Sequence, residues 1–257
     1  MIEQGPTRVS ITGIDGAGKD SISDLVAKDL TSVGVEPVVK LNRPAFIYTG
    51  GGKAALFEEE LNRIDHLHNW ADRKHHKSTI VAVNGVNVML QSHRLEKEVE
   101  KNNNPEVIMS ARDWRLDPAV YAEYYMKTFS KLFPMQKRIK AFQALTGSER
   151  DLIVLLKVDP ETAMERINER MIRESGESPD EIDRAKWQHI HENIIDLEKL
   201  RDGYPIAIDA LQKIRPETRI VEIDTNHGDK NYVADIAATA ILDTINGKIE
   251  PGERRKY

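Results

Sequence analysis

Hydrophobic and polar positions follow two different periods along this chain of 257 residues. Short runs of consecutive apolar residues predict buried strands, and apolar residues three or four positions apart predict amphipathic helices between them. The predicted strands are residues 8–12, 36–41, 106–110, 152–158 and 219–224. Strands that alternate with helices form parallel sheets. The sequence therefore predicts a three-layer α/β fold, a five-stranded parallel sheet with helices on both faces.

The stretch between the second and third predicted strands is long and polar. Residues 42–53 have a loop composition with three consecutive glycines, and residues 54–102 have a helical pattern. We interpret residues 42–104 as a helical insertion on the substrate side of one domain, residues 1–247. Residues 248–257 are polar and basic, and we expect them to form a loose tail.

A glycine-rich loop follows the first predicted strand and precedes a helix. Gly13, four further residues, Gly18 and Lys19 match the P-loop pattern, in which backbone N–H groups and a helix N-terminus surround phosphate groups. The glycines are needed because the backbone must adopt φ/ψ values closed to other residues. The predicted phosphate-binding residues are Gly13, Asp15, Gly16, Ala17, Gly18, Lys19, Asp20 and Ser21. The alternative is a glycine-rich turn that carries a lysine by chance.

The composition excludes several other classes of protein. A net charge of −5 argues against a general nucleic-acid or membrane-surface binder. The absence of cysteine excludes disulfides, thiolate metal sites and cysteine nucleophiles. The first residues do not form a signal peptide and no apolar run reaches transmembrane length, so we expect a cytoplasmic protein.

Candidate metal and substrate residues stand beside the P-loop. The position after Lys19, where Ser or Thr usually holds Mg²⁺, is Asp20, and Ser21 follows. Arg112 and Asp113 follow the third predicted strand, and open α/β sheets place their chemistry at such strand ends. Because carboxylate oxygens suit Mg²⁺, the candidate metal ligands are Asp20, Ser21 and Asp113. A purely structural ion pair of Arg112 and Asp113 is the alternative.

Four arginines follow the fourth predicted strand, at positions 166, 170, 173 and 184. They surround a polar loop, and the segment 166–186 resembles the lid of nucleoside-monophosphate kinases, which closes over the triphosphate. The alternative is an arginine-rich helix face in solvent.

Several motifs resemble those of thymidylate kinases. The sequence Gly-Ile-Asp-Gly-Ala-Gly-Lys at 13–19 is similar to their P-loop, which carries an acid at the place of Asp15. Residues 158–166 are similar to the strand and helix before their lid, and the Arg-Asp-Gly-Tyr at 201–204 resembles the Arg-x-Gly-Tyr after it. Arg112 matches the arginine of their Asp-Arg pair, although the acid has moved to Asp113.

The resemblance is looser in the insertion. Arg43 and the glycines after it resemble the loop that meets the substrate's monophosphate in that family. Arg73 lies in an Ala-Asp-Arg sequence and Arg94 lies in the next predicted helix, and either could be the family's substrate-facing arginine.

The resemblance implies the P-loop kinase fold and transfer of phosphate from ATP, with Mg²⁺, to a nucleoside monophosphate, a dTMP-like one being favoured. Lys19 would then bind the triphosphate, Asp15 would position the acceptor, and Arg112 would bind the acceptor phosphate. Some family members carry an arginine within the P-loop, where this chain has Gly16. The transition-state arginine would therefore come from Arg166, Arg170, Arg173 or Arg184. Base and sugar specificity stay open, as does a homodimer built on the aromatic helix after Asp117.

Two rival functions remain open. Polyphosphate kinases of the second family also carry an acid in the P-loop and often end it in Gly-Lys-Asp, as Asp20 does here. A non-catalytic nucleotide-binding protein is the other, because Asp20 and Ala111 depart from the kinase pattern.

Overall fold

The computed structural model describes residues 5–41, 46–48, 53–54, 66–67, 70, 79, 96–125, 131–146, 149–176, 192–227 and 229–257. The strands in chain order are β1 Thr7–Thr12, β2 Val38–Leu41, β3 Phe46–Tyr48, β4 Lys53–Ala54, β5 Val107–Ser110, β6 Leu152–Lys157, β7 Arg219–Asp224 and β8 Arg254–Lys256. The helices are α1 Lys19–Ser32, α4 Glu96–Asn103, α5 Leu116–Tyr125, α7 Met135–Thr146, α8 Pro160–Ser175, α10 Ile194–Ile214 and α11 Lys230–Ile245.

The described strands form one sheet in the order β4-β3-β2-β5-β1-β6-β7-β8. Strands β2, β5, β1, β6, β7 and β8 pair in parallel, and β3 and β4 add an antiparallel hairpin beside β2. Strand β1 lies in the middle, with Ser10 opposite Ser110 of β5 and Ile153 of β6. The loop after β1 therefore leaves the sheet at the centre of its carboxyl edge, where parallel sheets bind ligands.

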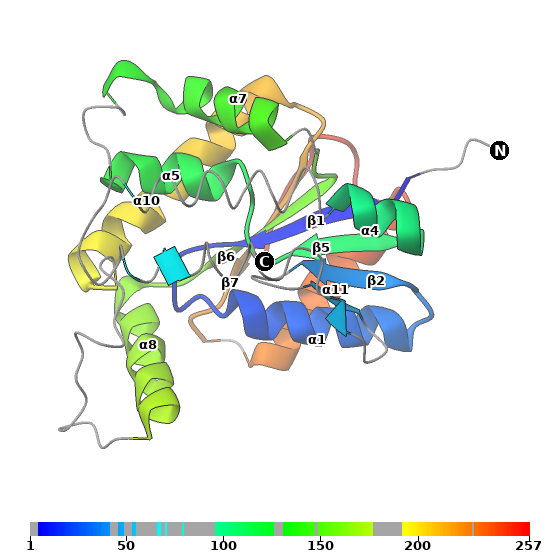
Figure 1. The fold of residues 1–257 in the computed structure, drawn as a ribbon, viewed down its shortest axis with the longest axis horizontal. Coiled ribbons are helices and arrows are strands. Elements are labelled where there is room, and N and C mark those ends of the chain that lie inside the picture. The colour runs from blue at the N-terminus through cyan, green and yellow to red at the C-terminus, as the bar shows by residue number, and fades with distance from the viewer. Residues whose placement is uncertain are drawn as a thin grey trace.

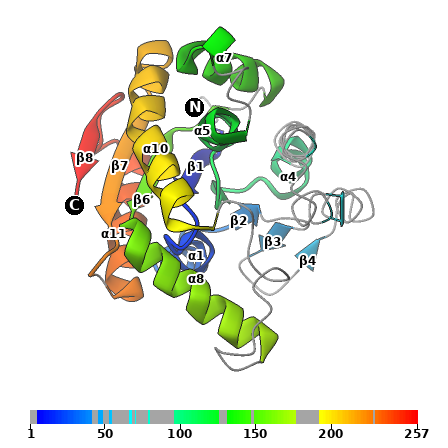
Figure 2. The same cartoon turned by 90° about the vertical axis from the view of Figure 1, so that its left-hand side faces the viewer.

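Helices cover both faces of this sheet (Figures 1 and 2). Helices α1 and α11 lie on one face, and α5, α7 and α10 lie on the other. The central strands are buried along almost their whole length, because a parallel sheet covered on both faces excludes water from both sides. In the first helix Ile22, Val26 and Leu30 are buried, as the helical spacing of apolar residues predicts, whereas Val33, which the same pattern placed on this face, follows the end of the helix and is 61% exposed. The prediction of a three-layer α/β fold is thus confirmed.

The prediction of five parallel strands is wrong, because six of the strands in the described residues pair in parallel. The sixth, β8, comes from residues 248–257, which we expected to be loose. Its sequence Arg-Arg-Lys carries no apolar pattern, so periodicity could not reveal it. Backbone pairing with β7 holds it, together with ion pairs from Arg254 to the buried Glu222 and to Asp209.

The expectation of a plain loop at residues 42–53 is also corrected, since β3 lies within it and β4 begins at Lys53. Most of the predicted insertion, and the lid beyond residue 176, lie outside the described residues. Among the residues that the structure describes, no helix has the length and apolar character needed to cross a membrane.

Candidate functional site

The glycine-rich loop lies between the end of β1 and the start of α1. Gly13, Gly16 and Gly18 have φ angles of 150°, 82° and 88°, which only glycine adopts readily. The ammonium of Lys19 folds back over the loop and donates to the carbonyl oxygens of Gly13 at 2.9 Å and Ile14 at 2.8 Å. Lys19 is 6% exposed and is therefore buried, whereas a lysine that faces a ligand would be expected to be open to solvent. The loop has the backbone conformation and the positive charge of a polyphosphate-binding site.

Helix α8 approaches this loop so closely that position 16 has no room for a side chain. A Cβ atom on Gly16 would lie 2.5 Å from the carbonyl oxygen of Ala163 and 2.8 Å from its Cα atom. Arg166, one turn further along α8, donates to the carbonyl oxygens of Gly16 at 3.4 Å and Thr225 at 2.5 Å. This packing explains why the loop carries no arginine of its own, and it fastens Arg166 to the loop and to the end of β7.

Asp15 is the centre of a polar cluster beside the loop. Its Oδ1 atom lies 3.3 Å from Nζ of Lys19 and 3.4 Å from Nη2 of Arg112. Its Oδ2 atom accepts a hydrogen bond from the hydroxyl of Tyr121 on α5 at 3.1 Å. The structure therefore brings together three residues that the sequence predicted at one site, Asp15, Lys19 and Arg112.

A second carboxylate, Asp117 on α5, lies on the other side of Arg112. Its Oδ2 atom is 3.6 Å from Nη1 of Arg112, and its Oδ1 atom accepts a hydrogen bond from the hydroxyl of Thr12 at the end of β1. Burial raises the pKa of Asp117 above its usual value, although Arg112 and Lys19 act to lower it. Burial would lower the pKa of Arg112, but Asp15, Tyr121 and Asp117 together raise it well above its ordinary value.

Tyr204 connects α10 to the loop from the opposite side. Its buried hydroxyl donates to the carbonyl oxygen of Gly13 at 3.1 Å. Gly203 lets α10 pack closely on α5, since a Cβ atom there would lie 3.0 Å from Cγ1 of Val120. The Arg-Asp-Gly-Tyr sequence at 201–204 thus has a physical role here, in which the glycine sets the helix spacing and the tyrosine holds the loop.

No sequence motif marked Asp117, Tyr121 or Tyr204 as part of the site. The pattern Asp117-Pro118 is typical of a helix start, and an aromatic residue such as Tyr121 in an amphipathic helix usually belongs to the core. The two stand four residues apart and therefore share one face of α5, on the side of Arg112. That spacing after a strand-end arginine was the available signal.

Asp113 does not lie at the site as predicted. It is 0% exposed and pairs with Arg115, whose Nη2 atom is 3.2 Å from its Oδ2 atom. Its Oδ1 atom accepts hydrogen bonds from the backbone N–H groups of Arg115 and Leu116, both at 2.9 Å. Asp113, and not Asp117, therefore caps the start of α5, and Arg115 holds the pKa of Asp113 below its usual value against the effect of burial. These contacts leave no oxygen directed toward a metal ion or substrate.

Asp20 and Ser21 occupy the first turn of α1 and both are exposed. The ammonium of Lys40, buried on β2, donates to the backbone oxygen of Asp20 at 3.2 Å and pairs with Asp24 at 2.6 Å. Asp20 and Ser21 are thus accessible to solvent in the helical turn that follows the loop. Within the described part of the chain, no group of three or more His, Cys, Asp or Glu side chains could already hold a metal ion.

The remaining predicted arginines are only partly placed. Arg170 on α8 pairs with the buried Glu192 at 2.7 Å, and Glu192 raises its pKa against the lowering effect of burial. The negative charge of Asp15 also acts to raise this pKa. Arg173 is exposed in the last turn of α8. Arg43, Arg73, Arg94 and Arg184 lie outside the described residues.

A central parallel strand, a glycine-rich loop with a lysine and the helix that starts from it form the βα unit of a P-loop. Consistent with this, the structure is similar to that of a deoxyadenosine kinase from M. mycoides solved with the products dCMP and a flexible dCDP bound. The TM-score is 0.51 and the sequence identity 16%, over 94% of this chain and 100% of that one. At this identity the likeness concerns the fold. No family profile and no curated protein matches the sequence.

Proposed function

We propose that this protein is a kinase that transfers the γ-phosphoryl group of ATP to a nucleoside monophosphate, a dTMP-like acceptor being favoured by the resemblance to thymidylate kinases. The observation that carries the proposal is the position of Arg112. Its guanidinium reaches the P-loop beside Asp15 and Lys19 from the neighbouring strand β5. A cation on the acceptor side of a phosphate cradle is what an anionic acceptor requires.

The chain's own residues supply most of what phosphoryl transfer needs, which is positioning and charge neutralisation. Lys19 and the loop N–H groups would hold the triphosphate, and Arg112 the acceptor phosphate. An acceptor phosphate oxygen would form a bond to the γ-phosphorus while the bond to the bridging oxygen of ADP breaks. Asp15, already paired with both cations, would fix their spacing and orient the acceptor.

The loop fits ATP because its glycines leave the backbone bare and its lysine is directed over it. Mg²⁺, when bound with ATP, neutralises charge on the phosphates. Asp20 and Ser21 are the residues that would hold it, because both are exposed beside the loop. Asp113 is not among these residues, because its oxygens are committed to Arg115 and the helix start.

A second candidate is a nucleoside kinase, in which the acceptor is a hydroxyl group. Two observations favour it, the structural likeness to a deoxyadenosine kinase and the two carboxylates, Asp15 and Asp117, on either side of Arg112. A carboxylate could accept the proton that a hydroxyl acceptor must lose.

A donor and acceptor panel separates these functions. Purified protein is incubated with ATP or polyphosphate and with deoxynucleosides, ribonucleosides or their monophosphates, and products are separated by ion-exchange chromatography. Diphosphate formed from a monophosphate and ATP supports the proposal. Monophosphate formed from a nucleoside supports the second candidate, and turnover with polyphosphate alone supports a polyphosphate kinase. Nucleotide binding without any turnover contradicts all three.

Lys19→Met is the matched negative control for this panel. Methionine keeps an unbranched side chain that lacks only the position of Nζ, and it removes the charge. We expect turnover to fall by at least about 10²-fold, since one such charge contributes roughly 3 kcal/mol to the transition state. The loop also loses three hydrogen bonds from Nζ, so circular dichroism and urea unfolding must show that the variant is folded. Unchanged turnover in a folded variant would contradict the assignment of the phosphate site.

A further inference from the structure

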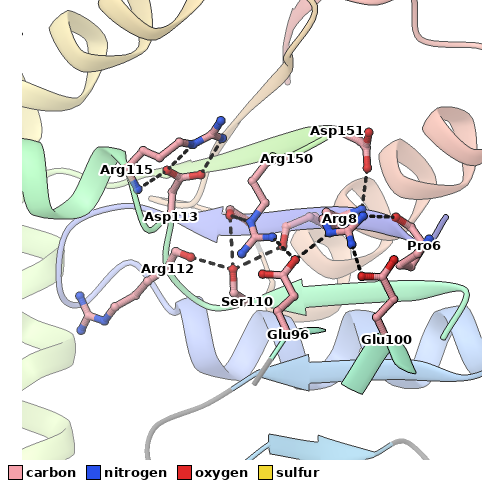
Figure 3. A network of polar contacts seen from close by, with 12 residues as sticks. Pro6, Arg8, Glu96, Glu100, Ser110, Arg112, Asp113, Arg115, Arg150 and Asp151 are labelled. Atoms are coloured by element: carbon pink, nitrogen blue, oxygen red, sulfur yellow. Dashed lines mark hydrogen bonds and ion pairs between the residues drawn. The ribbon is translucent and has the colours of Figure 1, made fainter. Parts of the chain in front are cut away.

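A chain of hydrogen bonds runs beneath the candidate site and ends at the backbone of Arg112 (Figure 3). Arg150 donates from Nη1 to Glu96 of α4 at 2.7 Å and from Nε to the hydroxyl of Ser10 at 2.9 Å. The hydroxyls of Ser10 and Ser110 are 3.3 Å apart, and that of Ser110 donates to the carbonyl oxygen of Arg112 at 2.7 Å. Glu96, Arg150 and both serines are buried, so water does not compete with these contacts.

The donors and acceptors available determine the direction in which each hydrogen bond of this series is donated. The hydroxyl of Ser110 lies 2.7 Å from the carbonyl oxygen of Arg112 and 3.5 Å from that of Val9, and carbonyls only accept, so its one proton points to the nearer oxygen, that of Arg112. The guanidinium of Arg150 can only donate, so Ser10 accepts there and its own proton points to Ser110. Each hydroxyl thus accepts one hydrogen bond and donates one, from a charged donor to a peptide carbonyl. Hydrogen bonds in such a series polarise and strengthen one another.

The end of this series is the point where the chain turns out of β5. Ser110 is the last residue of the strand, and Arg112 lies in the bend after it. Figure 3 shows the carbonyl of Arg112 facing Ser110 while its side chain extends away from the network. Fixing that carbonyl fixes the direction in which the side chain leaves the backbone. The side chain itself is 35% exposed, and its contacts with Asp15 and Asp117 are long, at 3.4 and 3.6 Å, so its position also depends on the direction in which it leaves the backbone.

We propose that Ser110 is a positioning residue, polarised by Ser10 and Arg150, which sets the orientation of Arg112 toward the acceptor phosphate. The hydrogen bonds that hold the carbonyl of Arg112 are observed in the structure, and only the acceptor phosphate rests on the proposed function. The two parts are therefore tested by separate measurements, one without turnover and one with it.

The first measurement is the ¹³C resonance of the Arg112 carbonyl. Labelling with ¹³C-carbonyl arginine and ¹⁵N-aspartate selects Arg-Asp peptide bonds, of which the sequence has three, and the peak of Arg112–Asp113 is identified by its loss in Arg112→Lys. Ser110→Ala should shift this peak to lower frequency, and Ser10→Ala should shift it less in the same direction. The control Thr244→Val removes a buried hydroxyl that bonds within α11 and takes no part in this series of hydrogen bonds, and it should leave the peak unchanged.

The second measurement is steady-state kinetics of the same variants. Because a small misplacement of a substrate-positioning group is costly, Ser110→Ala should lower kcat/KM for the acceptor about 10- to 100-fold, with KM for ATP unchanged. Ser110→Thr keeps the hydroxyl and should restore both the peak position and kcat/KM.

An unmoved Arg112 carbonyl peak in Ser110→Ala overturns the proposal, and so does a moved peak with wild-type kcat/KM for the acceptor. If Ser110→Ala does not fold, the intermediate shift in Ser10→Ala decides the question in its place. If the wild type shows no turnover in the panel above, the proposed function fails, and the carbonyl peak alone decides whether Ser110 orients Arg112.

Discussion

Gly16→Ala tests the close packing of α8 on the P-loop. Gly16 has a φ of 82°, and a left-handed conformation costs about 1–2 kcal/mol for a residue with a Cβ atom. The new methyl group would also lie 2.5 Å from the carbonyl oxygen of Ala163, which belongs to a helix backbone and cannot rotate away. Overpacking of this kind costs about 1–3 kcal/mol more. We therefore expect Gly16→Ala to lower the free energy of unfolding by about 2–5 kcal/mol.

Gly34→Ala is the matched control. Gly34 has a φ of 88°, almost the same as that of Gly16, but no atom lies within 4 Å of its added Cβ position. Its substitution bears the conformational cost alone, about 1–2 kcal/mol. Urea unfolding of both variants, followed by circular dichroism, isolates the cost of the contact as their difference, about 1–3 kcal/mol. Equal losses in the two variants would show that α8 does not confine position 16.

Three further predictions concern single side chains. Single glutamine substitutions of Arg170, Arg173 and Arg184 should lower kcat by about 10³-fold for at least one of them, with little change in acceptor KM; if kcat is unchanged in all three, the transition-state arginine lies elsewhere. If Asp20 is a metal ligand, Asp20→Ser should need a higher Mg²⁺ concentration for half-maximal activity. Tighter ATP binding and faster turnover at every Mg²⁺ concentration would instead mean that Asp20 only repels phosphate. Burial raises the pKa of Asp117 in the folded protein above its ordinary value of 3.8, so ionising this side chain destabilises the wild type as the pH rises above 3.8. Asp117→Asn cannot ionise and should therefore gain stability relative to the wild type over the same pH range. If the unfolding free energy of the variant minus that of the wild type does not increase with pH, the reasoning is wrong.

The sequence alone determined the features that depend on neighbouring residues. A strand buried on both faces must be a nearly continuous apolar run, so the five central parallel strands could be read from hydrophobicity. The P-loop could be read because its backbone conformation requires glycines at fixed spacing, and Arg112 because it follows a predicted strand. Strand β8 escaped because backbone pairing and the ion pairs of Arg254 hold it, and neither leaves an apolar pattern.

Only the tertiary structure decided which side chains act together. Asp113 and Asp117 stand in the same short segment. In the folded protein Asp113 caps the start of α5, whereas Asp117 pairs with Arg112. Tyr204 meets Gly13 across 191 residues of sequence, a pairing set by the crossing of α10 and α5. Gly16 marks the approach of α8, which no local pattern records. Local sequence fixes backbone conformation and burial, whereas the partner of a polar side chain depends on which elements pack against it.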